Sequence, residues 1–189
     1  MYIGDWSSDV CSSDLQYLVF GLGRFGSSMA RALCAQGQEV LAVDSDQELV
    51  NQIASHVTQA LQLDATDEEA LRSLGVKNFD AAVVAIGQNT RDSILVSVLL
   101  KEMGIPYLIA KANDDLHAKV LRKIGVDKVV FPERDMGVRL ARSIVTPSVL
   151  DLMELSGDYQ LAEILLPSGW EGESLRSTDA RHKFGVNIL

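Results

Sequence analysis

Three glycines carry the strongest chemical signal in this chain of 189 residues. Gly21, Gly23 and Gly26 lie in the stretch FGLGRFGSSMA, directly after an apolar run and at the start of a helical pattern. In that context one glycine allows the turn, one lets a phosphate approach the backbone, and one lets helix and strand pack closely. A phosphate would then lie at the helix N-terminus, where backbone N–H groups are free. The motif predicts a nucleotide-binding loop, with a purely structural turn as the alternative.

Two large side chains stand inside this loop, Arg24 and Phe25. The forked guanidinium of Arg24 can pair with phosphate oxygens. A dehydrogenase loop gains nothing obvious from such a cation near the nicotinamide, whereas a polyphosphate has a terminal charge to be recognised. Arg24 therefore favours a polyphosphate ligand. We interpret Phe25 as a packing residue, with a dimer contact as one place for it.

Acidic residues follow the second and third predicted strands. Asp44 can accept both ribose hydroxyls, and its charge disfavours the 2'-phosphate of NADP. Its alternative role is to cap the next helix, for which Ser45 or Asp46 is also available. Asp64, in the stretch LDAT, is placed to meet the adenine or its ribose, with a second helix-capping acid as the alternative.

The remaining candidate residues lie around the same predicted edge of the sheet. Besides Asp64, LDAT supplies Ala65, and Thr66 as the predicted cap of a helix over 66–74. After the fourth and fifth strands come Ile86 and Gly87, which would wall the crevice, and Lys111, either a phosphate ligand or a solvated lysine. Glu133 begins a long helix and either complements its dipole or holds Mg²⁺ or Ca²⁺ near the phosphates.

No arrangement of residues indicates catalysis. His56, His117 and His182 are scattered, and we expect His117 at an exposed helix position. A redox enzyme would need an acid or base opposite the nicotinamide, and the sequence offers none. We therefore expect a protein that is not an enzyme.

Short apolar runs alternate with amphipathic segments from Tyr17 onward. This alternation predicts a doubly wound α/β fold with a parallel six-stranded sheet in the order 3-2-1-4-5-6. The predicted strands span 17–20, 40–43, 57–63 (diluted by polar residues and so placed at an edge), 81–86, 107–111 and 128–131. The predicted helices span 25–36, 66–74, 91–103, 114–124 (with Leu116 among its apolar residues), 133–145 and 148–155.

The ends of the chain follow other patterns. Residues 1–15 repeat Ser-Ser-Asp without any period and read like translated sequencing adapter, so we expect a non-native or disordered leader. We expect residues 16–132 to form the nucleotide-binding domain and 133–156 crossover or dimerisation helices. Residues 157–189 would begin a second lobe, with strands over 159–166 and in the final KFGVNIL.

Composition excludes several functional classes. The formal net charge of −9 argues against non-specific nucleic-acid binding, which needs a basic surface. Cys11 and Cys34 are isolated, which indicates reduced thiols rather than a disulfide framework. The apolar runs are far shorter than the roughly 20 residues that span a bilayer. Any membrane role would therefore come through a partner.

With these residues assembled, the chain resembles the RCK family (regulators of potassium conductance), and within it the cytosolic regulatory subunits of bacterial Ktr and Trk potassium-uptake systems. The resemblance runs from about Gln16 to Leu189, and its most specific stretches are GLGRFG and PERDMG. It implies a cytoplasmic, nucleotide-controlled regulator attached to the inner face of the membrane through a potassium channel or transporter. Such proteins dimerise through the helix after strand six and assemble into an octameric ring.

The resemblance also implies roles for individual residues. ATP and ADP would stabilise different ring shapes, and some relatives bind NAD(H). The three glycines would hold phosphates, Asp44 the ribose and Asp64 the adenosine. Arg24 would recognise the terminal phosphate and Glu133 would help to hold a divalent cation at the dimer interface. A fragment of an NAD-dependent oxidoreductase is the alternative, motivated by the glycine loop and Asp44.

Overall fold

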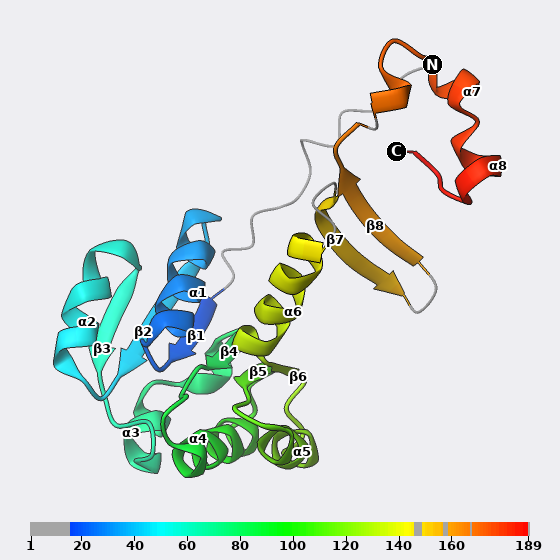
Figure 1. Ribbon diagram of the computed structural model, residues 1–189. Helices are drawn as coiled ribbons and strands as arrows, with labels where there is room; N and C mark the ends of the chain where they lie inside the picture. The colour runs from blue at the N-terminus through cyan, green and yellow to red at the C-terminus, as the bar shows by residue number, and fades with distance from the viewer. Residues whose placement is uncertain (1–15, 146–148, 157–158, 167, 189) are drawn as a thin grey trace. The chain divides into compact units, whose positions relative to one another are not determined.

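The chain folds into two compact units, the first ending at Pro132 and the second beginning at Glu133 (Figure 1). This computed structural model describes residues 16–145, 149–156, 159–166 and 168–188. The predicted leader over 1–15 lies outside the described residues. Each unit is described by itself.

A parallel six-stranded sheet forms the centre of the first unit, in the order β3-β2-β1-β4-β5-β6. This is the predicted order, and β3 lies at the sheet edge as expected. The strands are β1 (Gln16–Phe20), β2 (Glu39–Asp44), β3 (Gln59–Gln62), β4 (Ala81–Val84), β5 (Tyr107–Lys111) and β6 (Lys128–Val130). Because β1 pairs with both β2 and β4, the order reverses at β1. Ligands of open parallel sheets bind at such a switch point, beyond the carboxyl ends of the strands.

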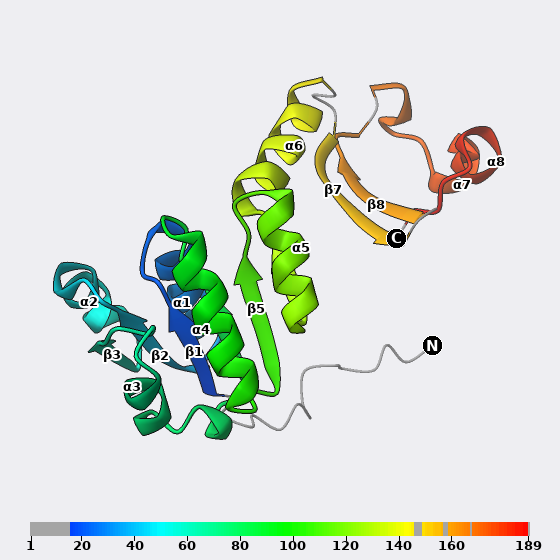
Figure 2. The same cartoon turned by 90° about the horizontal axis from the view of Figure 1, so that it is seen from below.

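Helices cover both faces of the sheet (Figures 1 and 2). They are α1 (Arg24–Ala35), α2 (Gln47–Ile53), α3 (Glu68–Ser73), α4 (Thr90–Glu102) and α5 (Asp115–Ile124), with the 3-10 turns η1 (Ala54–His56) and η2 (Val76–Asn78). Alternate residues of β1 enter different cores: Leu18 and Phe20 pack with residues of α3, α4 and α5, and Val19 packs with residues of α1 and α2. Every residue of β4 is buried, as expected of a central parallel strand.

Helix α5 buries most of the predicted apolar stripe at least in part but not its first residue, and it buries a polar residue that was expected to be exposed. Leu116 is 73% exposed, whereas His117, Ala118 and Leu121 are buried. The prediction of an exposed His117 was therefore wrong. The apolar residues of this helix cover more than one face, so residue type does not decide which face is buried. The prediction counted Leu116 as buried only because it is apolar. The side chain of His117 accepts a hydrogen bond from the backbone N–H of Asn113 at the start of the helix.

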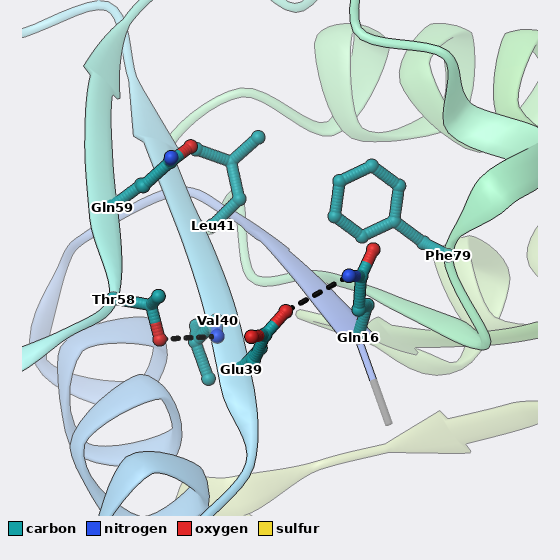
Figure 3. A pocket seen from close by; sticks show the side chains of 7 residues that line it. All are labelled: Gln16, Glu39, Val40, Leu41, Thr58, Gln59 and Phe79. Atoms are coloured by element: carbon teal, nitrogen blue, oxygen red, sulfur yellow. Dashed lines mark hydrogen bonds between the residues drawn. The ribbon is translucent and has the colours of Figure 1, made fainter. Parts of the chain in front are cut away.

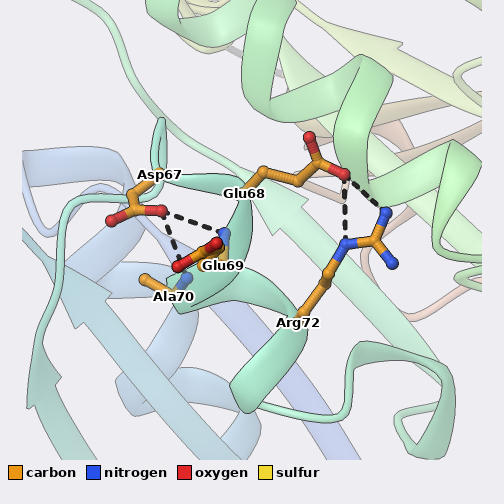
Figure 4. A network of polar contacts seen from close by, with 5 residues as sticks. All are labelled: Asp67, Glu68, Glu69, Ala70 and Arg72. Carbon is orange, nitrogen blue, oxygen red and sulfur yellow. Dashed lines mark hydrogen bonds and ion pairs between the residues drawn. The ribbon is translucent and has the colours of Figure 1, made fainter.

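The helix after β3 begins later than predicted. Asp67, not Thr66, is the N-cap of α3: its Oδ1 accepts hydrogen bonds from the backbone N–H groups of Glu69 at 2.9 Å and Ala70 at 3.3 Å (Figure 4). Glu68 and Arg72 form an ion pair along the same helix. Thr66 instead bonds to Asp64, which matters for the site.

Helix α6 (Pro132–Val145) belongs to the second unit from Glu133 onward and lies close to the predicted helix over 133–145. An antiparallel hairpin follows, formed by β7 (Val149–Ser156) and β8 (Tyr159–Ile164). The helix predicted over 148–155 is thus a strand over its described part, because it pairs with β8. The unit continues with η3 (Ser168–Trp170), α7 (Leu175–Thr178) and α8 (Ala180–Phe184). The predicted final strand was wrong, since Lys183 and Phe184 end α8 and residues 186–188 have no regular structure.

Candidate functional site

A pocket of about 430 Å³ opens at the carboxyl ends of β1, β2, β3 and β4. This volume lies within the range of small-molecule sites, roughly 300–1,000 Å³. The pocket lies where the topology predicts a ligand, at the switch point beside β1 and β4. Its lining residues are Gly21, Gly23, Val43, Asp44, Ser45, Asp46, Leu49, Leu63, Asp64, Ala65, Thr66, Ala85, Ile86, Gly87, Gln88, Asn89 and Asp92.

The three loop glycines have three different reasons to be glycine. Gly21 has a φ of +91°, and an added Cβ would lie 3.0 Å from the backbone of Ala85 and Ile86. On Gly26 an added Cβ would lie 1.8 Å from the carbonyl oxygen of Gly21, an impossible contact. Gly23 is unlike both, because a Cβ there would meet no atom within 4 Å. Among the described residues nothing in the fold requires Gly23, and its open side belongs to the pocket.

The start of α1, beside these glycines, has no side-chain capping bond. Gly23 is the N-cap residue of α1, and the first intrahelical bond runs from Ser27 N–H to the Gly23 carbonyl. The first N–H groups of a helix have no partner within it. Such a helix start attracts an anion through both its dipole and these donors.

Asp44 joins the glycine loop to the end of β2. Its Oδ2 accepts a hydrogen bond from Leu22 N–H at 2.6 Å, and its Oδ1 accepts one from Asp46 N–H at 2.9 Å. Asp46, not Asp44, is the N-cap of α2, accepting from Glu48 N–H at 2.8 Å. Each carboxylate oxygen of Asp44 keeps further lone pairs, so the side chain can still accept from two hydroxyl groups.

Asp64 and Thr66 form a local unit on the pocket wall. The Oδ1 of Asp64 accepts from the Thr66 hydroxyl at 2.7 Å and from the Thr66 backbone N–H at 2.9 Å. These two bonds lower the pKa of Asp64, and the side-chain bond is the stronger cause. Asp64 is therefore ionised at neutral pH and held in one orientation. Ala65 lies between them and also lines the pocket.

The opposite wall is formed by the loop after β4. Ile86 and Gly87 line it, as predicted. An added Cβ on Gly87 would lie 3.3 Å from the Nζ of Lys111, so Lys111 from β5 reaches this wall. Asn113 also reaches it, donating from its Nδ2 to the Gly87 carbonyl at 2.7 Å.

Three of the predicted site residues do not line the pocket: Arg24, Phe25 and Glu133. Arg24 is the exposed first residue of α1, one position after Gly23. Phe25 is half-buried and packs against the core on the α1 side of the sheet, which agrees with the packing role predicted for it. Glu133 lies in the first turn of α6, in the second unit, and its role as a cation ligand stays a prediction.

Sequence reasoning did not assign several polar residues of the pocket and its wall to the site, among them Asn89, Asp92 and Asn113. Asn89 caps α4, accepting from Arg91 N–H at 3.0 Å, and its Nδ2 donates to Asp92 at 2.7 Å. Both line the pocket, and Asn113 holds its wall. Asn89 and Asn113 each follow a buried strand, so their place after strands four and five was the available signal.

A second pocket, of about 210 Å³, lies at the other ends of the strands (Figure 3). Three of its polar side chains are engaged within the fold: Gln16 Nε2 donates to Glu39 at 2.8 Å, and Val40 N–H donates to the Thr58 hydroxyl at 3.0 Å. Ligands of this fold class bind at the carboxyl ends of strands, so this pocket is the weaker candidate.

Two features are absent from the described part of the chain. In it, no three His, Cys, Asp or Glu side chains are grouped so that they could hold a metal ion. None of its helices combines the length and apolar character needed to cross a membrane.

Curated relatives resemble most of the chain. It is 47% identical over 174 residues to the Ktr system potassium uptake protein C of Bacillus subtilis, covering 92% of this chain and 79% of the relative. It is 44% identical over 174 residues to the Ktr system potassium uptake protein A of the same organism, covering 92% and 78%.

Solved structures of lower sequence identity share the fold. The GsuK channel bound to NAD matches with a TM-score of 0.67 at 16% identity, covering 93% of this chain and 32% of the channel chain. GsuK bound to ADP matches with a TM-score of 0.61 at 17% identity, covering 72% and 36%. The family model of the TrkA-N domain matches residues 17–132, which include the whole of the pocket lining. This chain therefore belongs to the TrkA-N domain family.

Proposed function

We propose that this chain is a nucleotide-sensing regulatory subunit of a potassium-uptake system. The observation that carries the proposal is Gly23. No described part of the fold requires a glycine at position 23, because a Cβ there would meet no atom within 4 Å. Gly23 nevertheless lines the pocket at the start of α1. A phosphate that approaches the backbone there supplies the reason for a glycine. Relatives at 44% and 47% identity are potassium uptake proteins, which supports the potassium role.

The charges around the pocket orient the nucleotide. Four lining residues are aspartates, namely Asp44, Asp46, Asp64 and Asp92. Phosphates avoid these carboxylates and bind instead at the glycine loop, at the start of α1, where a helix offers backbone N–H groups and the positive end of its dipole. Ribose hydroxyls then face Asp44, and the adenine lies near Asp64 and Ala65. This arrangement suits ATP, ADP or NAD(H) and disfavours NADP, whose 2'-phosphate would meet Asp44. The solved GsuK structures with NAD and with ADP support this ligand class.

Switching requires a ligand that binds two states of the assembly unequally. ATP and ADP share the adenine, the ribose and two phosphates. Contacts to these shared groups therefore bind both nucleotides alike and cannot make ATP and ADP favour different states. Discrimination falls to residues near the terminal phosphate: Arg24, Lys111, and Glu133 with a Mg²⁺ or Ca²⁺ ion. We assign nucleotide binding to residues 16–132 and dimer contacts to 133–156, within a ring that acts on a membrane potassium transporter from the cytoplasm.

Titration calorimetry tests the nucleotide class. The full chain should bind ATP and ADP, and NADPH should bind much more weakly than NADH. NADPH as the tightest ligand, or hydride transfer to a substrate, would support the oxidoreductase alternative and sink the proposal. Absence of binding to all four nucleotides would leave a protein-interaction module.

The potassium role needs a separate measurement. Co-expression with the membrane subunits of the host's potassium-uptake systems should allow this chain to be purified with one of them. Uptake of potassium, or of rubidium as its tracer, into vesicles should then change when ATP replaces ADP on the cytoplasmic side. Equal transport with both nucleotides would contradict nucleotide control.

A further inference from the structure

His117 is the largest buried polar side chain among the described residues of the first unit, and it does not line the pocket. It is 1% exposed on the inner face of α5. Its Nε2 is buried and has no hydrogen-bond partner among the described residues. A buried polar atom without a partner costs free energy, so its presence needs a compensating reason.

The other ring nitrogen supplies that reason. Nδ1 of His117 accepts a hydrogen bond from the backbone N–H of Asn113 at 3.3 Å. The backbone N–H of His117 donates to Oδ1 of the N-cap residue Asp114 at 2.7 Å. The pair of bonds resembles a capping box in which histidine replaces glutamate and reaches back one residue further. An accepting Nδ1 places the proton on Nε2, so this hydrogen-bond network assigns the neutral tautomer. Burial lowers the pKa of His117 against the opposing charge of Asp114, which keeps the ring neutral.

Asn113 connects His117 to the wall of the pocket. Its Nδ2 donates to the carbonyl of Gly87, a lining residue, at 2.7 Å. The space where a Gly87 side chain would lie is bounded by Lys111 Nζ at 3.3 Å and by Asn113 Oδ1 at 3.9 Å. The loops that follow β4 and β5 thus meet at one point of the pocket wall, and Asn113 holds them together there.

We propose that His117 is a positioning residue for the nucleotide pocket. By fixing the backbone of Asn113, it sets the carboxamide that holds Gly87 and so fixes the wall beside Lys111. The inference rests on the proposed nucleotide function and adds to it a path from the core of α5 to the site. Capping alone does not account for the histidine, because Asp114 already caps α5. Packing alone would be served better by leucine, which leaves no buried nitrogen unpartnered.

Asn113 provides the first test because it is exposed and its replacement leaves the core intact. N113A removes the bond to Gly87, so ADP affinity measured by calorimetry on the full chain should fall roughly two- to tenfold, the worth of one hydrogen bond. Asn51→Ala is the matched control: Asn51 is also exposed and also makes one side-chain hydrogen bond, to Gln47 on α2. This control should bind as the wild type does. Unchanged ADP affinity in N113A would overturn the proposal whatever His117 does.

Two replacements of His117 separate positioning from packing. H117N places an amide oxygen where Nδ1 stood and should retain ADP affinity within about twofold. H117L fills similar space without an acceptor and should lose affinity about as much as N113A, the worth of one hydrogen bond. Equal binding by H117L and the wild type would overturn the proposal. If H117L fails to fold, the comparison of H117N with H117Q decides instead, since the glutamine oxygen occupies the place of Nε2 and should not rescue binding.

The double variant N113A/H117L gives the sharpest result. If His117 acts through Asn113, the double variant should bind ADP as weakly as N113A alone, because the path is already broken. Additive losses would assign His117 a separate structural role and contradict the inference. A wild-type chain that binds no nucleotide would refute the proposed function itself, and with it this inference. A wild type that binds ADP beside insensitive variants would refute the inference alone.

Discussion

At the scale of single residues, the glycines of the loop divide into those the fold needs and one it does not. Gly26→Ala forces a Cβ to within 1.8 Å of the Gly21 carbonyl, so we expect it to destabilise the protein by several kcal/mol or prevent folding. Gly23→Ala adds a methyl group in open space and should leave the free energy of unfolding within about 0.5–1 kcal/mol of the wild type. It should nevertheless weaken ATP and ADP, because the methyl group lies where phosphate approaches. Urea unfolding and calorimetry measure the two effects; equal nucleotide affinity in Gly23→Ala would contradict the site.

Arg24 allows a test of terminal-phosphate recognition. It is exposed at the first position of α1, so Arg24→Ala should fold normally. Loss of a charge-assisted hydrogen bond costs about 1.5–3 kcal/mol, and we expect this loss for ATP and a smaller one for ADP. Calorimetry with both nucleotides gives the ratio. Equal losses would reduce Arg24 to a general phosphate contact.

His117 also gives a stability prediction with a definite sign. Burial lowers its pKa in the folded state, so below about pH 6.5 the unfolded chain binds a proton that the folded chain does not. Stability should therefore be fully present above pH 6.5 and fall as pH decreases from there toward the folded pKa, by at most about 1.4 kcal/mol per pH unit. H117L should flatten this part of the curve. Urea unfolding between pH 5 and 8 measures it, and parallel curves for variant and wild type would show that His117 is not responsible.

At the scale of elements, the strand pattern was predictable and the helix faces were less so. The continuous apolar runs of β1, β2 and β4 identify strands covered on both sides, and with the glycine loop they indicate the sheet order. The helix predicted over 148–155 was wrong because VLDLMELS has no clear period, and pairing with β8 decided its structure. Within α5, a polar His117 is buried and an apolar Leu116 exposed, since a hydrogen bond outweighed residue type there.

The site was predictable to the extent that its residues follow strands. Gly21, Gly23, Asp44, Asp64 and Gly87 lie at or just after strand ends, and the structure brings them to one pocket, whereas Gly26 lies within α1 and outside the lining. Asn89 and Asn113 follow strands as well, but each also suits a helix cap or turn, and sequence alone does not show a side chain that crosses to another loop. The Asn113 bond to Gly87 joins residues far apart in the chain, which only the fold brings together.

The start of α3 provides a prediction about an element. Asp67 accepts from two backbone N–H groups, so Asp67→Ala should cost about 1 kcal/mol of stability, within a range of 0.5–2. Thr66→Val keeps this cap but removes the hydroxyl bond to Asp64 and should affect nucleotide binding more than stability. Thermal unfolding and calorimetry compare the two variants. A larger loss of stability in Thr66→Val would restore Thr66 as the cap.

At the scale of the whole molecule, α6 carries a stripe of exposed apolar side chains. Met136, Leu140 and Ile144 follow one stripe of this helix and are 50%, 55% and 77% exposed. We expect the chain to dimerise there, which agrees with the proposed ring. The double variant Leu140→Glu/Ile144→Glu should convert dimers to monomers in size-exclusion chromatography with light scattering. Leu116→Glu, at the exposed apolar residue of α5, is the control and should remain dimeric; the reverse pattern would move the interface to α5.

The unequal glycines also bear on how this sequence can change during evolution. Gly21 and Gly26 are required by backbone geometry, so a descendant that had lost its ligand would still need both to fold. Only Gly23 is free to drift once nothing approaches it. Gly21 and Gly26 are therefore expected in every descendant that keeps the fold, whereas Gly23 is expected only where selection still maintains a ligand. Among descendants of this chain, alanine or serine in place of Gly23 would identify the members that no longer bind a nucleotide.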